Sequence, residues 1–152
     1  MRKFLACCEE IEQAMAEIYK YWQKTYSDDQ EFSALWGVLF DDEQAHVSQI
    51  KLARRLQVDG VFSGSKVDNQ AIEALLARAR KLLVDVKKVT LSKEKALRTA
   101  IKMEETFNQV HVGNAAEFSD PSIKAMFTSL ARDDAKHVTT LHDYCERVFG
   151  KV

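Results

Sequence analysis

The sequence predicts an all-α protein: a bundle of four long helices, made of two helix hairpins joined by a long, partly helical crossover. Apolar residues make up 46% of the 152 residues and charged residues 30%, which is the balance of one soluble domain with a full-sized core. The 5 Gly and 1 Pro are too few turn formers for an all-β fold. Apolar side chains recur at helical spacing along most of the chain. We therefore expect a single domain over 1–152, with hairpins at 3–58 and 92–149 and the crossover at 59–91.

Local signals mark the helices of the first hairpin. The first helix should run from Lys3 to about Tyr26, where the apolar period breaks. Asp28 and Glu31 have the spacing of a capping box, which predicts the start of the second helix. Gly60 stands where a helix C-terminal stop is expected.

The crossover combines a loop with a helical segment. Residues 59–67 form the most loop-like stretch of the chain, and an amphipathic segment over 72–86 follows it. Ser92 is then the expected N-cap of the third bundle helix.

The last helix has the clearest boundaries. Asp120 is a capping residue, and Pro121 occupies the first helical position that proline favours. The apolar face of this helix should extend from Ile123 to Val148, and Gly150 should end it.

Six polar residues interrupt the apolar faces at matching positions in the two halves of the chain. The second and fourth bundle helices each carry a carboxylate followed three residues later by a histidine, and this spacing puts both side chains on one face. The first and third bundle helices each carry one glutamate among apolar neighbours. These candidate metal ligands are Glu12, Glu43, His46, Glu104, Asp134 and His137.

The six positions form an internal two-fold repeat. Glu43 follows Glu12 by 31 residues, and Asp134 follows Glu104 by 30. Two hairpins folded alike would place four carboxylates and two imidazoles at one level of the bundle. Buried like charges are costly unless cations neutralise them, and two divalent cations would do so. Oxygen-rich ligand sets with one imidazole each suit iron or manganese.

The residues around these ligands resemble ferritin-like proteins of the rubrerythrin type. The matching segments are Glu12-Gln-Ala-Met-Ala-Glu-Ile-Tyr19, Glu43-Gln-Ala-His46, Ala100-Ile-Lys-Met-Glu104 and Asp134-Ala-Lys-His137. The resemblance implies a ferritin-like four-helix bundle that binds two iron ions, with manganese or zinc as possible substitutes.

The resemblance also assigns a role to each ligand. It implies one metal held by Glu12 and His46, a second held by Glu104 and His137, and bridging carboxylates at Glu43 and Asp134. Tyr19 matches a tyrosine commonly found near the metals in this family, which makes it the candidate catalytic residue.

Three departures from the family pattern bear on function. Asp134 stands where a glutamate is usual, His111 stands where the repeat would place a second tyrosine, and Phe107 replaces an extra carboxylate. The Cys-rich rubredoxin module of full-length rubrerythrins is also absent from this chain. The resemblance therefore implies electrons from iron oxidation or from a separate donor such as a rubredoxin-like protein.

The function that the resemblance implies is reaction with hydrogen peroxide or O2, as a peroxidase or oxidase in oxidative-stress defence. One alternative is an iron-binding, ferroxidase or storage protein without peroxide turnover. Another is a metal-free structural bundle whose buried carboxylates form salt bridges with Lys51, Arg54 or Arg132. We expect a homodimer or a higher homo-oligomer; a large cage would favour storage, whereas a dimer would favour the redox role.

Net charge, apolar runs and cysteine content predict the partners and the cellular compartment of the protein. Net charge is −1, which leaves no positive excess for a nucleic-acid partner. No apolar run reaches the length of a membrane span, so we expect no membrane partner. Cys7, Cys8 and Cys145 form a poor disulfide framework and are expected to be buried free thiols in a cytoplasmic protein. His111 is expected in the core or in contact with a metal ligand, and His142 at the surface near a helix C-terminus.

Overall fold

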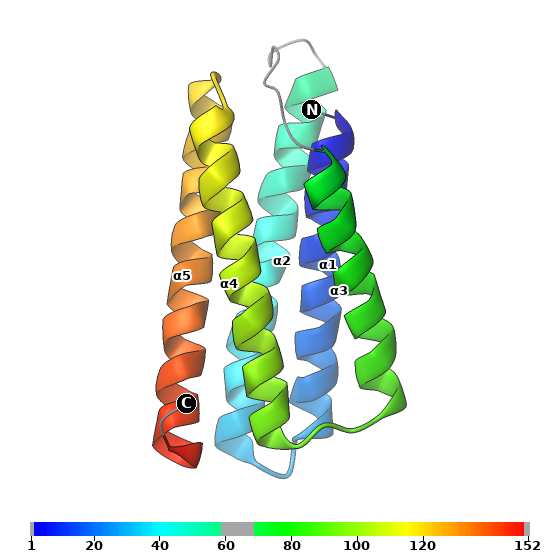
Figure 1. Ribbon diagram of the computed structural model, residues 1–152, viewed down its shortest axis with the longest axis vertical. Helices are drawn as coiled ribbons and strands as arrows, with labels where there is room; N and C mark the ends of the chain where they lie inside the picture. The colour runs from blue at the N-terminus through cyan, green and yellow to red at the C-terminus, as the bar shows by residue number, and fades with distance from the viewer. Residues whose placement is uncertain (1, 59–68, 151–152) are drawn as a thin grey trace. The chain divides into compact units, whose positions relative to one another are not determined.

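The computed structural model describes residues 2–58 and 69–150, and these form helices linked by short connections, without a β-strand in either range. The helices are α1 (Arg2–Thr25), α2 (Gln30–Val58), α3 (Asn69–Lys88), α4 (Lys93–Glu117) and α5 (Pro121–Phe149) (Figure 1). The prediction of an all-α protein is confirmed. The chain divides into two compact units, Met1–Thr90 and Leu91–Val152.

The first unit is a helix hairpin with a third helix packed on it. Helices α1 and α2 run antiparallel and contact each other along their length, and α3 packs against α1 (Figure 1). Helix α3 lies within the expected crossover, whereas Gly60 and the loop expected at 59–67 lie outside the described residues. The faces that meet are apolar. Their fully buried large side chains include Phe4, Leu5, Met15, Ile18, Tyr19, Trp22, Phe32, Trp36, Leu39, Ile50 and Ile72.

The turn between α1 and α2 differs from the prediction by one residue. The side chain of Asp29, rather than that of Asp28, accepts a hydrogen bond from the backbone N–H of Phe32 at 3.0 Å. Helix α2 therefore begins at Gln30. Both aspartates have capping chemistry, and the one with Phe32 three residues ahead of it satisfies that otherwise unpaired N–H.

The second unit is the hairpin of α4 and α5, which run antiparallel and pack against each other (Figure 1). Its predicted caps are confirmed. Ser92 accepts from the N–H of Lys95 at 3.3 Å, and Asp120 accepts from the N–H groups of Ser122 and Ile123 at 2.9 and 3.0 Å. Gly150 ends α5 with φ at 85°, a conformation that glycine adopts without steric cost.

One apolar position of α5 departs from the prediction. Val148 is 45% exposed, although Leu141 and Cys145 on the same helix are fully buried. The apolar face thus ends about one turn before the helix does. No helix among the described residues is long and apolar enough to cross a membrane.

Candidate metal centre

In the first unit, three of the predicted ligands meet between α1 and α2. Glu43 and His46 lie one helical turn apart on α2, with 3.3 Å between Glu43 Oε2 and His46 Nδ1. Glu12 reaches the same imidazole from α1, with its Oε2 at 3.5 Å from His46 Nδ1. One ligand atom from each residue lies within 4.8 Å of the other two. These three side chains therefore lie close enough together to bind one cation.

These three side chains are almost completely removed from solvent. Glu12 and Glu43 are each 1% exposed, and His46 is 2% exposed. Buried carboxylates cost several kcal/mol unless they are neutralised, protonated or hydrogen-bonded. Their position follows from the sequence, because each polar residue occupies the i, i+3 or i+4 position of an otherwise apolar, inward-facing stripe.

In the second unit, the corresponding residues form two pairs. Glu104 on α4 and His137 on α5 are buried, with 3.4 Å between Glu104 Oε2 and His137 Nδ1. Asp134, one turn before His137 on α5, is also buried. Its Oδ2 lies 2.7 Å from Nδ1 of His111 on α4.

The pair of Asp134 and His111 is predicted in part. The expectation places His111 in the core or beside a ligand, and it is buried against Asp134, but the sequence does not name this partner. The sequence does contain a signal, because His111 follows Glu104 by two helical turns and so shares its inward face. Asp134 therefore already has a strong hydrogen-bond partner, and its predicted bridging role stays a prediction.

The donor set fits a hard or borderline divalent metal. Each unit offers carboxylate oxygens and an imidazole nitrogen at buried positions, and none of the six predicted ligands is a thiolate. Such a set suits iron or manganese, whereas structural zinc sites favour Cys and His in a closed tetrahedron. The residues present thus fit the metal pair that the resemblance implies.

The cations considered as alternative partners lie elsewhere. The guanidinium of Arg54 pairs with Glu9 near the surface. Arg132 is exposed, and its Nε lies 3.7 Å from Asp133 Oδ1. Lys51 is also exposed. These three side chains are therefore not positioned as a buried salt-bridge network around the carboxylates.

Tyr19 lies in an aromatic cluster on α1, two helical turns after Glu12. It is fully buried on α1, seven residues after Glu12 on the same face. Its ring stacks on that of Trp36, with centroids 5.5 Å apart and 23° between the planes. Trp22 contacts both rings, at centroid distances of 6.1 and 4.7 Å. Packing against these two indole rings restricts the orientation of the Tyr19 ring.

The cysteines are free and buried, as predicted. Cys8 precedes Glu12 by one turn, and burial raises the pKa of its thiol well above the usual 9.0, with the charge of Glu12 raising it further. Burial also raises the pKa of Cys7. Both thiols therefore stay protonated near neutral pH, which argues against a thiolate nucleophile at either position.

Comparisons with protein families, with curated proteins and with solved structures found no match for this chain. The interpretation of the site therefore depends on the residues and distances described above.

Proposed function

We propose that this chain is a non-haem di-iron protein of the rubrerythrin-like, ferritin-like type, which reacts with hydrogen peroxide or O2. The observation that carries the proposal is the buried trio of Glu12, Glu43 and His46, whose ligand atoms lie within 4.8 Å of one another. The buried Glu104 and His137 of the second unit, which occupy the repeated positions, support it.

In this proposal the two hairpins form a ferritin-like bundle with one metal position in each half. Glu12 and His46 would hold one iron, Glu104 and His137 would hold the other, and Glu43 and Asp134 would be the carboxylates available to both. Manganese or zinc could occupy the same oxygen-rich set. When bound, the iron pair supplies the two electrons needed to reduce hydrogen peroxide to water.

The chain's own residues would control access and proton position. The apolar faces around the ligands keep bulk water away, which strengthens the electrostatic interactions of the carboxylates. The buried Tyr19 would supply a phenol on the inward face of α1, two turns after Glu12. His111 holds the Asp134 carboxylate at one position through the 2.7 Å contact.

The proposed function also requires an electron donor and a cellular compartment that suits it. Electrons would come from ferrous iron itself or from a separate rubredoxin-like donor. We propose a homodimer or higher homo-oligomer in the cytoplasm, a compartment in which the free thiols would stay reduced.

The test is anaerobic loading with Fe(II), followed by metal analysis and addition of peroxide. We expect about two irons per chain, as in di-iron bundles of this pattern. Glu43→Ala and His137→Ala should each lose bound iron and the absorbance change that follows peroxide. Asp42→Ala and His142→Ala are the matched controls, because both residues are more exposed neighbours on the same helices and should retain both properties.

Each outcome separates the alternatives. Stoichiometric iron without a reaction with peroxide would replace the peroxidase with an iron-binding or storage protein. Trace metal only, together with unchanged thermal stability on adding iron, would leave a structural bundle. Equal losses in the control variants would show that the assigned residues are not the ligands.

A further inference from the structure

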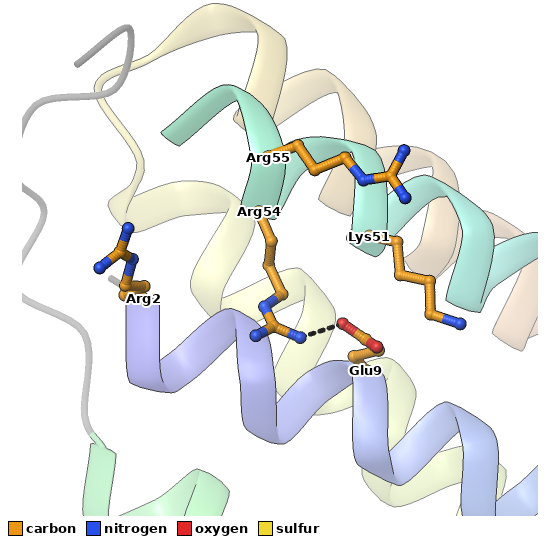
Figure 2. A pocket seen from close by; sticks show the side chains of 5 residues that line it. All are labelled: Arg2, Glu9, Lys51, Arg54 and Arg55. Carbon is orange, nitrogen blue, oxygen red and sulfur yellow. Dashed lines mark hydrogen bonds and ion pairs between the residues drawn. The ribbon is translucent and has the colours of Figure 1, made fainter. Parts of the chain in front are cut away.

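A second, chemically different pocket lies on the outer side of the first unit. It has a volume of about 320 Å³ and lies between the beginning of α1 and the C-terminal part of α2. Its lining residues are Arg2, Glu9, Lys51, Arg54 and Arg55 (Figure 2). Glu9 lies one turn before Glu12 but is directed toward the pocket, so the metal ligands take no part in it.

The charge of this pocket is opposite to that of the chain. Four cations and one carboxylate line it, an excess of three positive charges, while the whole chain carries −1. Cations gathered on one concave surface repel one another, and a bound anion relieves that repulsion. The concentration of positive charge thus indicates an anionic ligand.

The ion pair of Glu9 with Arg54 indicates how an anionic ligand would be bound in the pocket. Figure 2 shows the Arg54 side chain crossing from α2 toward α1, where its guanidinium pairs with Glu9. Lys51 and Arg2 lie on the two sides of this pair in the same view. Glu9 neutralises only one of the four cations. Arg2, Lys51 and Arg55 contribute three further positive charges to the same pocket.

The volume of the pocket and its net charge limit the anions that it can bind. A phosphate group carries about −1.5 to −2 at neutral pH, so two linked groups match an excess of three charges. Guanidinium groups bind phosphate oxygens in a bidentate manner, and three of the four cations are arginines. The volume is at the lower end of small-molecule pockets, which run from about 300 Å³ upward.

We propose that this pocket binds a small, soluble compound with two or more linked phosphate groups. The ligand displaces Glu9 from Arg54 and takes its place between the arginines and Lys51. The proposal is independent of the metal centre, because no residue is shared.

The experiment is calorimetric titration of the full-length chain with inorganic pyrophosphate, with orthophosphate and citrate as comparison anions. We expect one pyrophosphate per chain, bound more tightly than either comparison anion. Arg54→Gln and Arg55→Gln should each weaken binding by about tenfold, the loss of one charge-assisted contact. Glu9→Gln should strengthen binding several-fold, because the competing carboxylate is gone.

Matched controls separate a site from general electrostatics. Lys24→Gln removes a cation near the other end of α1, and Glu17→Gln removes an exposed carboxylate of the same helix. Neither should change the affinity more than twofold. Arg55→Gln leaves the pair of Arg54 and Glu9 intact, so it remains informative if Arg54→Gln folds poorly, which circular dichroism would reveal.

Three results would overturn the proposal. They are no binding of pyrophosphate at millimolar concentration, equal losses in Lys24→Gln and Arg55→Gln, or equal affinity for citrate and pyrophosphate. The last result would show that the pocket takes any compact polyanion and does not select linked phosphates.

Discussion

The contact between Asp134 and His111 is a short polar interaction within the candidate centre. Both side chains are buried, and 2.7 Å between Asp134 Oδ2 and His111 Nδ1 is a short, well-formed hydrogen bond. A buried imidazole that loses such a hydrogen bond bears part of the cost of its desolvation. The pair therefore contributes to stability as well as to the orientation of a proposed ligand.

Asp134→Ala should destabilise the metal-free protein by about 1–3 kcal/mol, the range for removing one partner of a buried polar pair. Urea unfolding in the presence of a chelator would measure it. Asp133→Ala is the control, because Asp133 pairs with the exposed Lys136 at 3.0 Å and should change stability by about 1 kcal/mol or less. Equal effects of the two substitutions would contradict the importance of the buried pair.

At the scale of the helices, capping chemistry defines where each hairpin begins. Asp120 accepts two backbone hydrogen bonds at the start of α5 and is followed by Pro121, while Ser92 accepts one longer bond at the start of α4. Unpaired N–H groups at a helix start are satisfied by such side chains, and a carboxylate also interacts favourably with the helix dipole. The two caps should therefore differ in strength.

Asp120→Ala is expected to lower the free energy of unfolding by about 1–2 kcal/mol, and Ser92→Ala by roughly 0.5–1 kcal/mol. Chemical denaturation of both variants beside the wild type would measure these differences. Asp120→Asn should recover most of the loss, because asparagine also caps well. A larger effect at Ser92 than at Asp120 would contradict the reasoning from the hydrogen bonds.

Local chemistry explains which helix boundaries were predictable. Ser92, Asp120 and Gly150 act through their immediate neighbours in sequence, so their roles could be predicted and are confirmed. The prediction that Asp28 caps α2 was wrong, because the adjacent Asp29 has the same chemistry and only the geometry of the turn decides between them.

Contacts between helices were less predictable than helix boundaries. The burial of the six candidate ligands follows from the helical period and could be predicted. The contact of His111 with Asp134 could not, since it depends on the register of α4 against α5. The cationic pocket was also missed, because Lys51 and Arg54 look in sequence like partners for the buried carboxylates, whereas the structure directs them outward.

At the scale of the whole molecule, metal binding and folding should be linked. If iron binds the folded chain and not the unfolded chain, iron at 100 times its dissociation constant should stabilise the fold by about 2.7 kcal/mol. Anaerobic thermal unfolding with and without Fe(II) would measure this gain. It should fall in Glu12→Gln, which removes a ligand of one of the two irons, and stay unchanged in Glu105→Gln, whose carboxylate is exposed beside His142.

The stacked aromatic surroundings of Tyr19 and the polar contact of His111 occupy equivalent places in the two repeats, yet they are chemically unlike. In one half this place holds a tyrosine packed among indole rings, and in the other it holds an imidazole paired with a carboxylate. Two metal ions bound at these positions would be nonequivalent, with different affinities and different redox potentials. Loading would then be sequential, so that a chain holding a single ion is a distinct species with its own spectrum and its own chemistry.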